Sequence, residues 1–261
     1  MTNIRLTIQY DGTDYSGWQV QPPDAKKRQT LTIQGILQQA IKKITGEDAN
    51  VLSSGRTDAG VHALGQVASF KTGSRLSADV LMTAINANLP DAIRLIEASE
   101  TSGDFHPRYD ARGKIYFYVI SNDRVVSPFL HRYAWRLPHK LDFDGMKGST
   151  KALIGTYDFS AFRASGCGAK STVRTVSNIS IEKLTGIDFM TARLAGNFLK
   201  ISIEADAFLR HMVRNIVGTI VEVGRGKIRT EDVAGILMSK DRKLAGPTAP
   251  ARGLFLDRVF Y

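Results

Sequence analysis

The residues with the clearest chemical potential lie in one short segment, residues 53–63, with the sequence SSGRTDAGVHA. It holds a single carboxylate, Asp58, with Arg56 two residues earlier and a glycine on either side. A nearby guanidinium favours the ionised form of a carboxylate. An ionised, partly desolvated aspartate can serve as a covalent nucleophile, and glycines permit a large ligand to approach closely. On spacing alone, an aspartate that stabilises a turn is the commoner alternative.

Other familiar catalytic and metal sites do not fit the sequence. Residues 165–171 are similar to a phosphate-binding loop, but Ala164 and Ala169 stand where that loop requires glycines. The one cysteine, Cys167, lies in this segment without a nucleophile signature, so we interpret it as a loop thiol. The five histidines lack zinc-site spacing, and neither CxxC nor HExxH occurs. We therefore expect no metal.

Composition narrows the class of partner. The 261 residues are 43% hydrophobic and 23% charged, as in folded domains and unlike disordered chains. Lys and Arg total 35 against 25 Asp and Glu, so the net charge is +10. This excess favours a polyanionic partner, with nucleic acid ahead of a membrane surface. No apolar run approaches the ~18 residues of a membrane span, and the N-terminus has the alternation of a strand, unlike a signal peptide.

Periodicity predicts the elements that must position these residues. Strands are expected at residues 4–10, 51–53, 66–70, 93–98, 115–120, 173–184 and 198–206. Helices are expected at 33–44, 77–88, 143–154 and 212–221, with a short one from Thr230. Thr30 or Thr32 would cap the first helix, Gly46 would end it, and residues 21–28 would form a polar loop. Strand pairs without regular βαβ alternation predict an α+β fold, divided into residues 1–106 and 107–261.

The segment GRTDAGVHA strongly resembles the signature of the tRNA pseudouridine synthase A family. The resemblance continues in order along most of the chain, through YDG (10–12), GWQ (17–19), FHPR (105–108), the strand around Tyr116 and Tyr118, DFSAFR (158–163), SGC (165–167), FLRHMVRNIVG (208–218) and APARGL (249–254). In the last of these, Ala251 stands where a second proline is common.

This resemblance implies an enzyme that converts uridines at positions 38, 39 and 40 of the tRNA anticodon stem-loop to pseudouridine. It implies no metal or organic cofactor, and a homodimer in the cytoplasm. The implied fold is α+β, with two similar α/β halves that share a mixed, mainly antiparallel sheet and enclose a basic cleft.

The family's functional residues fall on particular positions of this chain. The resemblance assigns the catalytic aspartate to Asp58, the aromatic residue that packs on the target uracil to Tyr116, and the basic partner of the aspartate to Arg214. Arg56 matches the motif arginine that approaches the RNA. Tyr118, on the same strand face, is the alternative to Tyr116. Whether Asp58 attacks C6 of the base or C1′ of the ribose stays open.

Each assignment has an alternative. Tyr116 is otherwise a core aromatic of a central strand. Arg214, expected four residues after Arg210 on one helix, is otherwise part of a solvated basic flank. The chain as a whole is alternatively a non-catalytic basic RNA-binding protein, although Asp58 within an intact motif argues against this. Hydrolysis of a glycosidic bond usually needs two carboxylates flanking the bond, and this motif has one.

Overall fold

A computed structural model describes residues 1–21 and 31–261. Thr30 and nearly all of the predicted loop at 21–28 lie outside the described residues. The chain divides into two compact units. Unit 1 comprises Met1–Arg112 with Phe255–Tyr261, and unit 2 comprises Gly113–Leu254.

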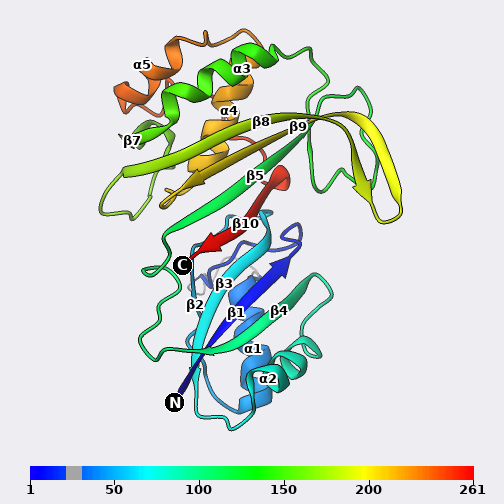
Figure 1. Ribbon diagram of the computed structural model, residues 1–261, viewed down its shortest axis with the longest axis vertical. Coiled ribbons are helices and arrows are strands. Elements are labelled where there is room, and N and C mark those ends of the chain that lie inside the picture. The colour runs from blue at the N-terminus through cyan, green and yellow to red at the C-terminus, as the bar shows by residue number, and fades with distance from the viewer. Residues whose placement is uncertain (22–30) are drawn as a thin grey trace, which may run out of the picture. The chain divides into compact units, whose positions relative to one another are not determined.

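Unit 1 is built around a mixed sheet in the order β4-β1-β3-β10, with β2 paired to β3 (Figure 1). Its strands are β1 (Thr2–Tyr10), β2 (Leu52–Ser53), β3 (His62–Thr72), β4 (Ile93–Thr101) and β10 (Leu254–Phe260). β1 is antiparallel to both β3 and β4, whereas β10 runs parallel to β3, with Phe255 opposite His62. Because β10 pairs with β3, the last residues of the chain support the strand that follows Asp58.

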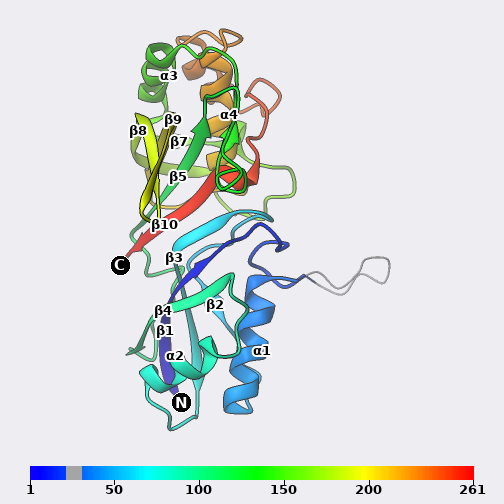
Figure 2. The ribbon, with the colours of Figure 1, turned by 90° about the vertical axis from the view of Figure 1, so that its right-hand side faces the viewer.

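Helix α1 (Ile33–Thr45) forms where the apolar spacing predicts it. Thr32 accepts a hydrogen bond from the backbone of Gly35, and Gly46 ends the helix in the left-handed conformation (φ 75°). Leu37 and Ile41 are fully buried, and Figure 2 shows α1 alongside the sheet. Burying one such side chain contributes about 1.5–3 kcal/mol.

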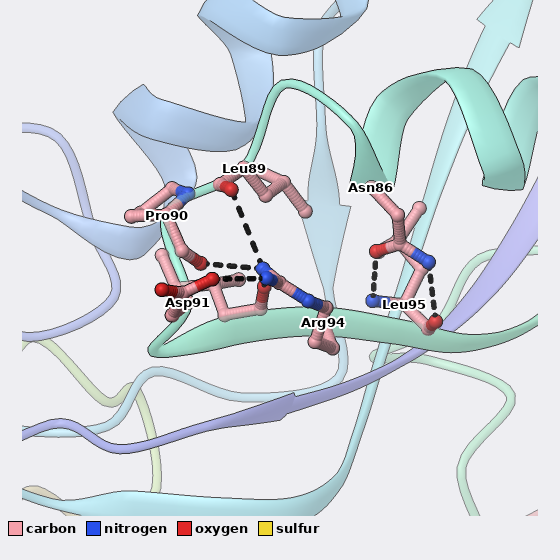
Figure 3. Close-up of polar contacts among 7 residues, drawn as sticks. Asn86, Leu89, Pro90, Asp91, Arg94 and Leu95 are labelled. Atoms are coloured by element: carbon pink, nitrogen blue, oxygen red, sulfur yellow. Dashed lines mark hydrogen bonds and ion pairs between the residues drawn. The ribbon is translucent and has the colours of Figure 1, made fainter.

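The turn between α2 (Ala78–Asn86) and β4 is fixed by two side chains (Figure 3). The Asn86 side-chain amide donates to the Leu95 carbonyl and accepts from the Leu95 N–H, each at 2.8 Å. It therefore satisfies both main-chain groups of Leu95, as a neighbouring strand would. Arg94 donates to the Pro90 carbonyl at 2.6 Å and to the Asp91 carboxylate at 2.6 Å. These bonds fix the turn between α2 and the start of β4.

Unit 2 has a sheet in the order β5-β9-β8-β7, with antiparallel pairing between neighbours and β6 parallel to β5. Its strands are β5 (Gly113–Ser121), β6 (Trp135–Arg136), β7 (Gly155–Asp158), β8 (Val173–Phe189) and β9 (Ala192–Ala205). Its helices are α3 (Phe143–Thr150), α4 (Met212–Gly224) and α5 (Asp232–Ser239), with 3₁₀ turns η1 (Lys151–Leu153), η2 (Ser160–Phe162) and η3 (Ala251–Gly253). Every residue of α4 except Arg214 is buried, and Figure 2 shows α4 alongside this sheet.

The predicted α+β class, with a mixed and mainly antiparallel sheet, is confirmed. The predicted end of the third helix is wrong. The third helix stops at Thr150 and gives way to η1. The placement of Arg210 on the helix of Arg214 is also wrong: that helix begins at Met212, as the apolar spacing predicts, because His211 has a left-handed backbone (φ 62°). Arg210 therefore precedes the helix and forms no helical i, i+4 pair with Arg214.

The division of the chain also differs in position from the predicted one. The prediction separates residues 1–106 from 107–261, whereas the compact units meet at Arg112 and Gly113. It also leaves the C-terminal strand with the second half, whereas residues from Phe255 onward belong to unit 1. The reason is the long-range pairing of β10 with β3, which local periodicity does not encode.

Candidate active site

Asp58 lies in a tight loop between β2 and β3. Thr57 is buried, Asp58 is half-buried and Arg56 is exposed. The turn closes through main-chain atoms, since the Val61 N–H donates to the Asp58 carbonyl at 3.1 Å. Gly60 takes the left-handed conformation (φ 76°), as its place in the motif predicts. The loop thus holds Arg56 and Asp58 on one short, turned segment.

Hydrogen bonds among buried, uncharged groups hold this loop in place. The hydroxyls of Tyr10 and Thr57 lie 2.7 Å apart, and the amide of Gln66 donates to the Gly55 carbonyl at 2.9 Å. Ser54 donates in turn to the Gln66 side-chain oxygen at 2.7 Å. Burial raises the pKa of Tyr10 to about 12, although its bonds to Thr57 and Gln66 act in the opposite direction. The phenol therefore stays neutral over the physiological range.

Residues 15–18, which follow β1, also contact the Asp58 loop. The main-chain N–H of Trp18 donates to the Thr57 carbonyl at 3.0 Å, and the Gly60 N–H donates to the Tyr15 carbonyl at 3.3 Å. Gly17 has φ 89°, and a Cβ there would lie 2.6 Å from the Thr57 oxygen, so only glycine fits this approach. Trp18 is fully buried, with its ring 6.2 Å from that of Tyr10. The GWQ stretch is therefore a support for the Asp58 loop.

His62, at the end of the loop, is a buried packing residue. Its ring stacks on Phe255 at 4.6 Å, and its Nδ1 accepts from the Gly12 N–H at 3.1 Å. The same Nδ1 lies 3.1 Å from the Asp11 carboxylate. The Asp11 N–H donates to Ala92, in the turn that Arg94 stabilises. These contacts tie the loop to the rest of unit 1.

In unit 2, β5 carries both tyrosines of the family resemblance on one strand face. Tyr116 is 7% exposed and meets Phe208 edge-on, with ring centroids 5.1 Å apart. Tyr118 is fully buried, and its hydroxyl donates to the Pro250 carbonyl at 2.7 Å. Burial raises the pKa of Tyr118 well above its ordinary value, against the opposite effect of Arg214 and Arg252. Tyr118 is thus the more buried of the two tyrosines, and its hydroxyl is held by a hydrogen bond.

Arg214 is the one residue of α4 that is not buried. A main-chain carbonyl orients its guanidinium. Its Nε donates to the Ala249 carbonyl at 2.7 Å. In return, the Ala249 N–H donates to the Arg214 carbonyl at 3.1 Å. Its charge also acts on the hydroxyl of Tyr118, so unit 2 brings these two candidate residues together.

The segment around Cys167 is not a phosphate-binding loop. Residues 165–171 lead into strand β8, whereas a phosphate-binding loop leads into a helix. Burial raises the pKa of the Cys167 thiol, but hydrogen bonds from the backbone of Arg210 and Ala169 and the charges of Arg163 and Arg174 outweigh it. The net effect is a pKa below the ordinary thiol value, in a loop joined to Arg210 by the Ala164 N–H.

Across residues 1–21 and 31–261, no helix is both long and apolar enough to cross a bilayer. Within the same described ranges, no three or more His, Cys, Asp or Glu side chains group in a way that could hold a metal ion.

The sequence reasoning missed the supports of both candidate regions. The sequence places Tyr10 in a predicted strand and in the YDG match, and Gln66 at the start of another predicted strand, but it predicts no contact of either with the Asp58 loop. A polar side chain at an inward strand position is the signal that could have identified Gln66. Ala249 belongs to the APARGL match, but its side chain gives no sign of this contact, because only its main-chain atoms orient Arg214.

Comparison with known proteins identifies the class. The model of the family described as tRNA pseudouridine synthase matches residues 6–110 and 150–261. Three relatives named tRNA pseudouridine synthase A align over the full length of both chains: those of Thermoanaerobacter sp. strain X514 and Acetivibrio thermocellus at 45% identity, and that of Thermodesulfovibrio yellowstonii at 43%. These matches define an enzyme of RNA modification. The chain belongs to the tRNA pseudouridine synthase family, as the sequence resemblance predicted, and is an isomerase that forms pseudouridine in tRNA.

Proposed function

We propose that this enzyme isomerises uridines at positions 38, 39 and 40 of the tRNA anticodon stem-loop, with Asp58 as nucleophile on a flipped-out uridine. The observation that carries the proposal is the Asp58 loop. Hydrogen bonds hold this loop on both sides of the aspartate. Thr57 is bonded by the main chain of Trp18 and by the buried Tyr10 hydroxyl, and Gly60 is bonded to the main chain of Tyr15. Such preorganisation suits a group that must meet a reacting atom in fixed geometry.

The chemistry requires a nucleophile and an extruded base. The uracil must leave the helix to expose its reacting atoms, at a cost of a few kcal/mol. The C1′–N1 bond then breaks, the base turns, and a C1′–C5 bond forms while a proton leaves C5 and N1 gains one. Asp58 attacks either C6 of the base or C1′ of the ribose, and both routes keep the atoms of the substrate balanced.

The remaining candidates act on the same substrate. Tyr116 offers a flat face to the extruded uracil, where stacking contributes about 1–3 kcal/mol. Its fixed ring, held edge-on by Phe208, favours this role over that of Tyr118, whose hydroxyl is engaged with Pro250. Arg214 supplies an oriented guanidinium to the reacting nucleotide. Arg56, which is exposed close to Asp58 in the loop, contacts the RNA backbone or fills the position in the stem that the flipped-out uridine vacates.

The wider setting follows from charge and family. A net charge of +10 suits phosphate contacts with tRNA, and the reaction needs neither a metal nor an organic cofactor. We expect a cytoplasmic homodimer, as the family resemblance implies, and a dimer would let one tRNA, which is large relative to one chain of 28.7 kDa, contact both subunits. Light scattering with and without tRNA should give the mass of a dimer, and a stable, fully active monomer would contradict this part of the proposal.

The proposal is tested by mapping pseudouridine in tRNA transcripts after incubation with the enzyme and a metal chelator. We expect modification at one or more of positions 38, 39 and 40, and none elsewhere. Asp58→Asn should bind tRNA without modifying it, and Asp79→Asn, a substitution at an exposed site on α2, should act as wild type. Modification confined to other positions, or substantial turnover by Asp58→Asn, would overturn the proposal.

A further inference from the structure

The segment of residues 245–253 contacts Arg214 and Tyr118, two of the three candidate residues of unit 2. Ala249 exchanges two hydrogen bonds with Arg214, one from each partner, at 2.7 and 3.1 Å. The next residue, Pro250, accepts the Tyr118 hydroxyl at 2.7 Å. The position of this segment therefore sets the orientation of the Arg214 guanidinium and of the Tyr118 ring.

The same segment lies against the main chain of α4. A Cβ on Gly218 would overlap the Pro247 carbonyl, and a Cβ on Gly246 would lie 2.8 Å from the Gly218 oxygen. The Gly246 N–H also donates to the Thr219 hydroxyl at 2.9 Å. Because backbone meets backbone here, a small shift of the segment cannot be absorbed by side chains.

Arg242 fastens this segment at its beginning. One terminal nitrogen, Nη1, donates to the carbonyls of Ala245 at 3.2 Å and Gly246 at 2.9 Å. The other, Nη2, donates to the Asn215 side-chain oxygen at 3.0 Å and to the Thr248 hydroxyl at 3.1 Å. A single planar group thus joins the segment, at three of its residues, to helix α4.

Asn215 is the anchor on the helix, and it is the neighbour of Arg214. Its side chain is fully buried and donates to the Phe162 carbonyl of η2 at 2.7 Å. The opposite end of the amide accepts from Arg242 and also from Thr248, the latter at 2.6 Å. The fixed amide gives Arg242 a rigid point of attachment.

We propose that Arg242 is a positioning residue for the reaction: it holds the 245–253 segment on α4, and through Ala249 it orients Arg214. The inference rests on the role of Arg214 in the proposed function. Arginine is required because its planar fork reaches four acceptors at once, which an ammonium on a flexible stem does not reproduce. A guanidinium misplaced by about 1 Å can lower a rate by as much as about 100-fold.

The main test is Arg242→Lys, which keeps the charge and removes the fork. Under single-turnover conditions with a tRNA transcript, we expect the rate constant to fall about 10-fold or more, with the Kd for tRNA within about twofold. Lys243→Ala, at the exposed neighbouring residue, is the matched control and should change neither. An unchanged rate constant in Arg242→Lys would overturn the proposal.

A double-mutant cycle separates positioning from general damage to the fold. If Arg242 acts through Arg214, Arg242→Lys should cost little more once Arg214 is already lysine. If the two losses multiply, Arg242 does not act through Arg214 and the proposal fails. At Thr248, Thr248→Ser retains the hydroxyl and should keep the wild-type rate, whereas the isosteric Thr248→Val should behave like Arg242→Lys.

A readout without substrate keeps this inference distinct from the proposed function. In Arg242→Lys, the Ala249 amide should exchange its proton at least about 10-fold faster, because its bond to Arg214 opens more often. The Arg214 Nε–H resonance should shift as well. If both stay as in wild type, the proposal is wrong whatever the enzyme modifies. If the wild type forms no pseudouridine at positions 38–40, the proposed function fails, and these two signals still decide the role of Arg242.

Discussion

The Asp58 loop and the Arg214 region are held in place by opposite means. The Asp58 loop rests on neutral groups that are buried, chiefly the Tyr10 hydroxyl and the Gln66 amide, on strands next to it in the sheet of unit 1. Arg214 is oriented by main-chain atoms of a segment 35 residues later, and that segment is held by Arg242, a partly exposed cation.

Because of this difference, substitutions in the two regions should affect different quantities: the unfolding free energy near Asp58 and the reaction rate near Arg214. A buried neutral group that loses its partner costs about 1–3 kcal/mol, so damage beneath the Asp58 loop should destabilise unit 1. A partly exposed guanidinium that loses its partners can bind water instead, so damage near Arg214 should change the rate more than the stability. Substitutions of similar size can test this contrast.

The largest effect is expected at Asp58 itself. Asp58→Asn keeps the shape of the side chain and removes the nucleophile, so turnover should fall by a factor on the order of 10³ or more. The melting temperature and the Kd for tRNA should stay near wild type. Single-turnover assays and thermal melts check this. A loss of stability as large as the loss of turnover would mean that Asp58 belongs to the support of its loop.

The next effect is expected at Arg214. Arg214→Lys keeps a positive charge but loses the Nε bond to Ala249, so we expect a rate about 10- to 100-fold lower with tRNA affinity little changed. Arg210→Lys, before the start of α4, is the comparison and should mainly weaken binding. Rates and binding constants measured on both variants decide the matter. Equal effects of the two substitutions on binding alone would make Arg214 an ordinary phosphate contact.

The contrast also explains how much the sequence alone could predict. The Asp58 loop and helix α1 follow from local signals: glycines around a carboxylate, apolar spacing, and the Thr32 and Gly46 caps. The end of the chain does not, because β10 is defined by its pairing with β3 and leaves only a short apolar alternation in the sequence.

The supports of Arg214 were beyond sequence reasoning for a related reason. Ala249 acts through its backbone, and main-chain contacts leave no residue signature. Arg242 reads as one more basic residue in a chain with 35 of them, and only the fold brings it to Asn215. The sequence places Arg210 on the helix of Arg214, because no residue type in the FLRHMVRNIVG segment signals the left-handed backbone of His211.

A third effect, on stability, is expected beneath the Asp58 loop. Tyr10→Phe removes the hydroxyl that lies 2.7 Å from the Thr57 hydroxyl in a buried site. The unfolding free energy should fall by about 1–2 kcal/mol, and the rate should fall only a few-fold. Denaturant unfolding measures the first quantity, with Tyr109→Phe at an exposed tyrosine as control. A rate loss above about 100-fold at wild-type stability would abolish the contrast between the two regions.

The smallest effect is expected at Asp158, where a charge supports the Arg214 region. Its carboxylate accepts from the Ser160 hydroxyl at 2.6 Å and the Ser160 N–H at 3.0 Å, and it lies 3.2 Å from the Lys240 ammonium. The Ser160 hydroxyl first, and then Thr172 and Lys240, hold the pKa of Asp158 well below its ordinary value of 3.8. The ionised form therefore stabilises η2, which supplies the Phe162 carbonyl to Asn215.

A pKa lowered in the folded state gives stability that is present above the ordinary pKa and lost as pH falls below it. Asp158→Asn should therefore lower the unfolding free energy by about 1 kcal/mol at pH 7, a value reduced for partial exposure of the carboxylate. The difference from wild type should shrink as the pH falls below about 4, because the unfolded chain then takes up a proton at Asp158 that the native state binds only at lower pH. Asp188→Asn, in the exposed pair with Arg193, should show a smaller difference at pH 7. Denaturant unfolding at several pH values tests this, and a difference that grows on acidification would show that the charge of Asp158 opposes folding.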